Sequence, residues 1–132
     1  MAGKYFLDSN IILYALGNDV SKKKIAQGLI NKDAIISTQV LTEVAQVCLQ
    51  KFVLTHAVVE AWIVLLNTET HVELISSDLI CEAINISRAT QYGFYDSLIV
   101  ATAQHSGVDT LYSEDMQHGR NVQHLQIINP FL

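Results

Sequence analysis

The sequence predicts an α/β fold: a three-layer α/β/α sandwich around a central, mostly parallel, five-stranded sheet. Short apolar stretches, typical of buried strands, alternate with longer segments whose apolar residues recur every three or four positions, as in amphipathic helices. This alternation implies parallel strands joined by helices that cover both faces of the sheet. The chain has 132 residues, 50% of them hydrophobic, and shows no linker or internal repeat. We therefore expect a single domain spanning residues 1–132.

The first strand is expected at residues 5–7, where a short apolar stretch leads into a run of polar side chains. A helix follows at 10–16 and ends at Gly17, because glycine readily adopts the positive φ that terminates many helices. Ser21 can cap the next helix, 21–30, since a serine hydroxyl accepts a hydrogen bond from a free N–H group at a helix start.

The second strand is expected at residues 34–36, which are alanine and isoleucine. Polar residues at 37–38 then begin a helix whose apolar positions recur at spacings of three and four as far as Cys48. Thr55 is expected to cap the helix after it, which continues through Leu66.

The second half of the chain continues the alternation of strands and helices. The expected elements are a strand at 71–75, a helix from Ser77 to near Gly93, a helix at 95–104 stopped by Gly107, and strands at 110–112 and 125–128. The longest irregular region is expected at 113–124.

Charge and hydropathy limit the environment and the partners. The net charge of −5 argues against a polyanionic partner, unless several acids are gathered at one metal site. No apolar run approaches the ~20 residues that a membrane span needs, and no signal peptide is evident, so we expect a cytoplasmic protein without membrane association. Cys48 and Cys81 lie in helical patterns and are expected to be buried, reduced thiols, which suits that compartment.

Acidic side chains from distant segments are expected to meet at one edge of the sheet. Asp8 directly follows the first strand, Asp115 follows the fourth, and Asp96 lies at the start of the helix that leads into the fourth strand. Glu43 lies on the second turn of the helix after the second strand, beside its apolar face. Ligands of such sheets bind at the carboxyl ends of the strands, so this edge is the expected site.

Each acid also has a simpler interpretation. Asp8 and Asp96 could cap helices, Glu43 could be a surface glutamate, and Glu114 with Asp115 could be a polar loop. If the acids are gathered, two carboxylates ~4 Å apart repel by about 1 kcal/mol in water and by about 4 kcal/mol near a protein surface. A divalent cation removes this repulsion, and oxygen-only ligands favour Mg²⁺, or Mn²⁺ in its place.

Basic residues offer candidate contacts to a phosphate backbone. The net charge of the residues outside the four acids is −1. The run Lys22, Lys23 and Lys24 could form a basic rim for phosphates, and Arg120 is a second candidate. An exposed helix face and a solvated loop arginine are the simpler interpretations.

Four motifs in order resemble the PIN-domain family, in particular ribonuclease toxins of the VapC type from toxin–antitoxin pairs. The stretch LDSN is similar to the opening Asp-Thr-Asn motif of the family, with serine in place of threonine, and TEV places Glu43 at the second acid. FYDSLIVATA resembles the third motif, and LYSEDMQHG followed by INPF resembles the last motif and the C-terminal strand. The resemblance covers essentially the whole chain.

The resemblance implies a Mg²⁺-dependent endoribonuclease with a PIN-like fold and RNA as its substrate. It implies catalytic and metal-binding roles for four acids: Asp8, Glu43, Asp96 and Asp115. It also implies that Ser9, Asn10 and Ser113 orient the carboxylates or the attacking water. A homodimer and a cognate antitoxin are the partners that the family pattern suggests. The adjacent Glu114 leaves open which acid of the pair faces the metal; the motif aligns at Asp115.

Two other functions fit the same fold class. Phosphoacceptor signalling modules also use clustered acids, but they need an acid pair near the first strand and a lysine after a late strand. Here Asp8 stands alone and no lysine follows Lys51. A non-catalytic PIN-like binding domain would keep the fold without the activity, and the presence of all four acids favours the enzyme.

Overall fold

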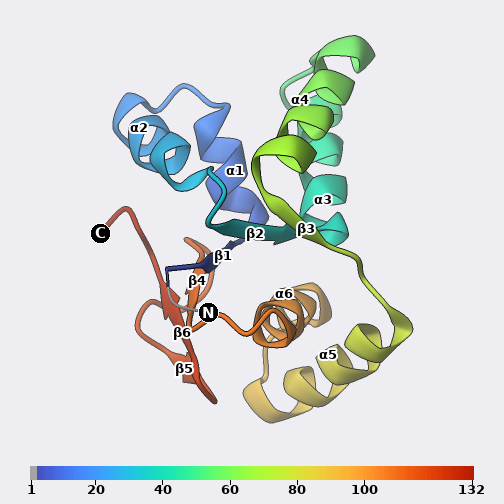
Figure 1. Cartoon of the computed structure of the whole chain (residues 1–132), viewed down its shortest axis with the longest axis vertical. Coiled ribbons are helices and arrows are strands. Elements are labelled where there is room, and N and C mark those ends of the chain that lie inside the picture. The colour runs from blue at the N-terminus through green and yellow to red at the C-terminus, as the bar shows by residue number, and fades with distance from the viewer. Residues whose placement is uncertain (1–2) are drawn as a thin grey trace.

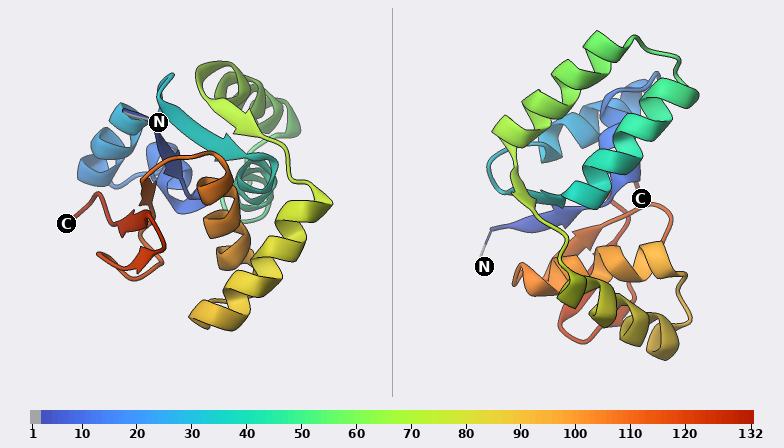
Figure 2. Two further views of the ribbon diagram at one scale, coloured as in Figure 1. Left: turned by 60° about the horizontal axis from the view of Figure 1, so that its bottom comes forward. Right: turned by 90° about the vertical axis from the view of Figure 1, so that its right-hand side faces the viewer.

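The computed structural model of the chain describes residues 3–132 and has three layers. Figure 1 shows α1 to α4 on one side of the central sheet and α5 and α6 on the other, and Figure 2 shows the same layers from two further directions. The elements in chain order are β1 (Tyr5–Leu7), α1 (Ser9–Ala15), α2 (Val20–Leu29), β2 (Ala34–Ser37), α3 (Thr38–Gln50), α4 (His56–Glu69), β3 (His71–Glu73), α5 (Ser77–Thr90), α6 (Phe94–His105), β4 (Thr110–Tyr112), β5 (Asn121–Val122) and β6 (Leu125–Ile128). The predicted α/β/α sandwich is confirmed.

The sheet has six strands in the order β3-β2-β1-β4-β6-β5, and all neighbouring pairs are parallel except β5 with β6. The prediction of five strands missed β5, a two-residue strand at the sheet edge, in the region expected to be irregular. A strand of two residues contains no hydrophobic periodicity, so the sequence pattern could not reveal it.

The strand order changes direction at the pair β1 and β4, which are neighbours in the sheet. The crossovers from β1 lead outward to β2 and β3, after which the chain returns to the opposite side of β1 to form β4. In open α/β sheets, a crevice forms at such a switch point, outside the carboxyl ends of the two central strands. Leu7 lies opposite Tyr112 in the register, so Asp8 and Ser113 leave these strands side by side.

Helix α6 lies between the sheet and α5, and its burial follows from that position (Figure 1). Every residue from Ser97 to Ala103 is buried, so this part of the helix has no solvated face. The polar residues in this stretch are tolerated because Ser97 and Thr102 donate hydrogen bonds to carbonyls one turn earlier in the chain. The buried α6 fixes the place of its first turn relative to the sheet.

Several local expectations are corrected by the structure. Helix α2 is capped by Asp19 rather than Ser21: the Asp19 carboxylate accepts a hydrogen bond from the backbone N–H of Lys22 at 3.2 Å. The third strand ends at Glu73, two residues earlier than expected.

The two cysteines differ in exposure. Cys48 is buried as expected, but Cys81 is exposed, because it lies on the outer face of α5 rather than against α6. Both are free thiols. None of the helices within residues 3–132 combines the length and the apolar character that crossing a bilayer requires.

Candidate active site

Asp8 is a buried carboxylate at the carboxyl end of β1, and its side chain is held by three residues. It is only 4% exposed. One oxygen accepts hydrogen bonds from the Ser113 hydroxyl at 2.8 Å and the Asn10 amide at 3.3 Å, and the other accepts the backbone N–H of Ser9 at 2.7 Å. Asp8 is also the N-cap residue of α1. Asp8 therefore caps a helix, as the simpler interpretation predicted, and it also lies where the sequence predicted a site.

Burial raises the pKa of Asp8 to about 6, from an ordinary value of 3.8. Hydrogen bonds from Ser113 and the Ser9 backbone oppose this increase, whereas the negative charges of Glu43 and Asp96 add to it. Burial makes the charged form of this carboxyl group unfavourable. A bound cation would stabilise the charged form.

Glu43 lies on the second turn of α3 and is half-buried. Its Oε1 atom is buried and has no hydrogen-bond partner. Burial raises the pKa of Glu43; hydrogen bonding from Ser9 and Gln39 opposes the increase, and the charges of Asp96 and Asp115 add to it. A buried carboxylate oxygen without a protein partner is rare in folded proteins, so this oxygen is free to accept a cation or a hydrogen-bond donor.

Asp96 lies in the first turn of α6, but it does not cap the helix. The N-cap residue is Gly93, which contributes no side-chain hydrogen bond. Burial raises the pKa of Asp96, and the charge of Asp115 adds to the increase. Asp115 itself is exposed at the mouth of the site. The four predicted acids therefore act on one another electrostatically, although they come from four separate segments.

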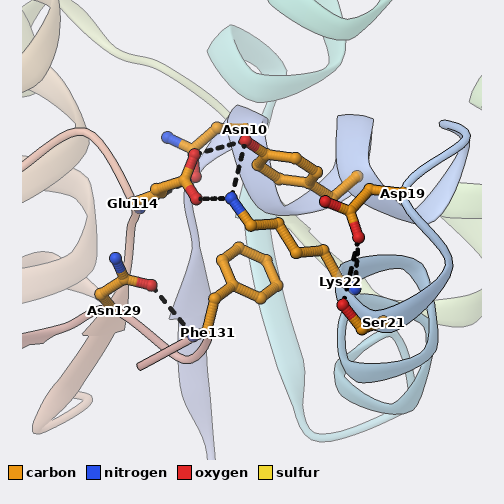
Figure 3. Close-up of polar contacts among 8 residues, drawn as sticks. Asn10, Asp19, Ser21, Lys22, Glu114, Asn129 and Phe131 are labelled. Atoms are coloured by element: carbon orange, nitrogen blue, oxygen red, sulfur yellow. Dashed lines mark hydrogen bonds and ion pairs between the residues drawn. The ribbon is translucent and has the colours of Figure 1, made fainter.

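Glu114 turns away from this acidic centre, which here denotes the group Asp8, Glu43, Asp96 and Asp115. Its carboxylate accepts hydrogen bonds from the Tyr14 hydroxyl and from the Lys22 ammonium, each at 2.5 Å (Figure 3). Its backbone N–H donates to the Asn10 side chain at 3.1 Å. In the structure, Asp115 is thus the acid of the pair whose charge reaches Glu43 and Asp96.

The basic residues occupy different environments. Lys22 is engaged with Glu114, whereas Lys24 is exposed on the same helix and Lys23 is half-buried. Arg120 donates a hydrogen bond of 3.1 Å to the Thr90 carbonyl, and its guanidinium stacks on a tyrosine ring at the end of α5. The structure therefore gives Arg120 a role in holding α5 to the loop after β4.

The acidic centre fits a hard divalent cation by its donor chemistry. All four side chains offer carboxylate oxygens, and the buried Oε1 of Glu43 lacks any partner. Among residues 3–132, no three Asp, Glu, His or Cys side chains are already arranged as the ligands of one metal ion. The acids are therefore gathered in one place without being closed around an ion.

A cavity of about 700 Å³ opens beside the acidic centre. Asn10 and Asp115 line the end that it shares with the centre, and Tyr14 and Phe52 contribute aromatic surface. Of the four acids, Asp115 is the one that lines this cavity.

Two residues of the site were not predicted from the sequence. Gln39 lies one turn before Glu43 on α3 and donates a hydrogen bond of 3.0 Å to the Tyr95 carbonyl at the start of α6. The spacing of four between Gln39 and Glu43 was an available signal. Tyr14 had no such signal, because its partner Glu114 is 100 positions away in the sequence.

Comparisons with known proteins agree with this fold. Residues 5–121 match the PIN domain family. No curated protein sequence matches the chain significantly. Among solved structures, a toxin–antitoxin complex from Klebsiella pneumoniae has a TM-score of 0.74 at 18% identity, covering 96% of this chain and 98% of that one.

Two further structures share the fold. VapC20 from Mycobacterium tuberculosis, a toxin that cleaves the sarcin–ricin loop, has a TM-score of 0.68 at 22% identity. The match covers 85% of this chain and 90% of VapC20. VapBC2 from Rickettsia felis, bound to a promoter DNA fragment, has a TM-score of 0.67 at 20% identity. The match covers 93% of this chain and 96% of the Rickettsia chain. At these identities the similarity concerns the fold. Since the family match spans most of the sequence, the chain belongs to the PIN-domain family.

Proposed function

We propose that the protein is a metal-dependent endoribonuclease that hydrolyses phosphodiester bonds of RNA as the toxin of a toxin–antitoxin pair. The observation that supports this most directly is the gathering of Asp8, Glu43, Asp96 and Asp115 at the switch point of the sheet. A carboxylate cluster with one unpartnered buried oxygen is suited to a hard cation and unsuited to an empty, charged state.

Asp8 and Asp96 would be the direct ligands of Mg²⁺, with Mn²⁺ as a substitute, and Glu43 and Asp115 would complete the pocket directly or through water. Such an ion, when bound, would supply Lewis-acid chemistry: it would make a nearby water more acidic and offset negative charge on a phosphate oxygen. Hydrogen bonds from Ser113, Asn10 and the Ser9 backbone hold the Asp8 carboxylate in one orientation. Gln39 ties α3, which carries Glu43, to the first turn of α6, which carries Asp96.

The protein is negatively charged, so cations must neutralise part of its charge near the site before RNA can bind. With a net charge of −5, the chain repels a polyanion unless cations neutralise the acidic centre. Lys23 and Lys24 are the proposed backbone contacts, whereas Lys22 and Arg120 are held by contacts within the protein.

A protein partner is also part of the proposal. The Klebsiella structure is a toxin–antitoxin complex, and this chain shares its fold. Helix α4 leaves Val58 and Leu65, seven positions apart on one face, 43% and 45% exposed, and exposed apolar side chains of this kind are often covered in protein interfaces. A homodimer with a bound cognate antitoxin is the expected assembly.

The test is cleavage of RNA by the purified protein in Mg²⁺, with and without EDTA. Asp8→Asn and Asp96→Asn are expected to reduce cleavage by a factor of at least about 100, as loss of a metal ligand does, while circular dichroism shows an intact fold. Asp109→Asn, an exposed acid next to β4, is the matched control and should cleave normally. Cleavage that persists in both site variants rules the proposal out. Mg²⁺ binding without any cleavage would favour a non-catalytic binding domain instead.

A further inference from the structure

Glu114, Lys22 and Tyr14 form a small network beside the acidic centre, drawn in Figure 3. The two carboxylate oxygens of Glu114 are used separately: Oε1 accepts from the Tyr14 hydroxyl and Oε2 from the Lys22 ammonium. Although partial burial acts to raise the pKa of Glu114, the hydrogen bonds from Lys22 and Tyr14 bring it below its ordinary value. Glu114 is therefore kept charged and fixed in direction.

Lys22 is itself restrained by aromatic rings. Its ammonium lies 4.5 Å from the centre of the Tyr14 ring and 5.3 Å from that of Phe131, and it donates a hydrogen bond of 3.3 Å to the Tyr14 hydroxyl. The two rings meet edge to face with their centres 5.0 Å apart. Cation–π contacts and a charged hydrogen bond together hold one lysine rotamer. A phosphate would have to compete with these contacts for the charge of Lys22.

The network acts on the segment that carries Asp115. This segment is anchored at one end by Ser113, whose backbone N–H donates to the Ile128 carbonyl at 3.0 Å. Its other end is anchored by Met116, which is buried. Between these anchors, Glu114 is pinned outward towards α1 and α2, and the neighbouring Asp115 is left as the acid that acts on Glu43 and Asp96.

We propose that Lys22 and Tyr14 are positioning residues that hold Glu114 away from the acidic centre and thereby set Asp115 towards it. This inference rests on the proposed metal-dependent nuclease function. It assigns Lys22 a role different from that of a phosphate contact, and it explains why an acid pair rather than a single acid follows β4. Glu114 fixes the position of the segment through its contacts with Lys22 and Tyr14, and Asp115 is left to contribute to the metal site.

The test measures Mn²⁺ affinity by electron paramagnetic resonance, together with RNA cleavage, for Lys22→Met, Glu114→Gln and the double variant. Glu114→Gln keeps the shape of the side chain but replaces one acceptor oxygen with an amide donor, so it can no longer accept from both Tyr14 and Lys22 and tests the network even if Lys22→Met folds poorly. Lys4→Met, at the opposite end of β1 from Asp8, where the lysine donates to the Lys32 carbonyl, is the matched control. Both network variants should bind Mn²⁺ about tenfold more weakly, a loss of the size expected for one charged hydrogen bond. The double variant should lose no more than the worse single variant, since the two residues act as one unit.

A phosphate-contact role for Lys22 predicts a different pattern. Lys22→Met would then raise KM and flatten the salt dependence of cleavage, while Mn²⁺ affinity and kcat stayed at the wild-type level. That result, or additive losses in the double variant, would overturn the positioning role. Wild-type protein that binds no Mn²⁺ would overturn it as well. A loss of Mn²⁺ affinity in the network variants, with no RNA cleavage by any variant or by the wild type, would sink only the nuclease proposal.

Discussion

The Ser113 hydroxyl donates a hydrogen bond of 2.8 Å to the Asp8 carboxylate across 105 positions of sequence. The same hydroxyl accepts the backbone N–H of Met116 at 3.4 Å. One serine thus couples the carboxyl ends of β1 and β4 and orients the most deeply buried acid of the centre. Its effect on Asp8 is measurable, because hydrogen bonding from Ser113 lowers the pKa of that group.

Ser113→Ala should raise the pKa of Asp8 further, because the buried charge loses its best donor. The acid limb of the pH profile for kcat/KM should move to higher pH, with a loss of roughly tenfold at neutral pH, the size expected for one hydrogen bond to a charged group. Ser106→Ala is the control: its hydroxyl bonds the Thr102 carbonyl at the far end of α6, so the limb should not move. An unshifted limb in Ser113→Ala would contradict the assigned role of this hydroxyl.

Divalent cations should stabilise the folded protein. At a concentration 100 times the dissociation constant, binding contributes about 2.7 kcal/mol to the free energy of unfolding. For a chain of this length, that corresponds to an increase in melting temperature on the order of 5–10 °C. Thermal melts with Mg²⁺ or Mn²⁺ against EDTA measure it.

Asp8→Asn and Glu43→Gln should greatly reduce this stabilisation, because each replaces a charged carboxylate with a neutral amide, which attracts a divalent cation less strongly. Asp109→Asn should retain it. An equal shift in all the variants would show that the ions bind elsewhere on the protein.

Stability of the metal-free protein should depend on pH through Asp8. Its pKa is about 6 in the folded protein against an ordinary 3.8, so the folded state holds the proton more tightly. The resulting stabilisation is complete below pH about 4 and is lost as pH rises through about 6, a change of roughly 2–3 kcal/mol at 1.36 kcal/mol per pKa unit.

The measurement is urea denaturation in EDTA at several pH values between 4 and 7. Asp8→Asn cannot titrate at this position, so the variant should gain stability relative to the wild type as pH rises. A difference in unfolding free energy that stays constant with pH would show that Asp8 does not titrate in this range.

Val53 adopts a left-handed backbone with φ of 50°, at the turn between α3 and α4. A β-branched residue in this conformation costs roughly 1–2 kcal/mol relative to glycine. Since Val53 is 77% exposed, Val53→Gly loses little packing. Glycine adds roughly 0.5–1 kcal/mol of unfolded-state entropy cost, so we expect a net stabilisation of about 0.5–1 kcal/mol.

Chemical denaturation of Val53→Gly beside Val64→Gly checks the effect. Val64 is an exposed residue in the middle of α4. Glycine should destabilise the protein there, because the residue already has helical φ and ψ and glycine has a low helix propensity. Destabilisation of similar size in both variants would mean that Val53 contributes contacts that outweigh its strain.

The order of the elements was predictable because hydrophobic periodicity and helix starts are local properties of the chain. The expected strand at 5–7 and the helix opened at 37–38 coincide with β1 and α3. The placement of Asp8 and Glu43 followed from those elements, since a parallel sheet brings the carboxyl ends of its strands to one edge. Where the local signal was weak, as in the two residues of β5, the prediction failed.

By itself, the sequence determined which residue types follow each strand, and so where a carboxylate cluster could form. Only the tertiary structure decided where the Glu114 carboxylate points, because its partners Tyr14 and Lys22 are 100 and 92 positions away in the sequence. It likewise decided that Lys22 and Arg120 make contacts within the protein and that Cys81 faces solvent. The orientation of a side chain is set by its neighbours in space, and local sequence patterns specify those neighbours only within one helical turn or one strand.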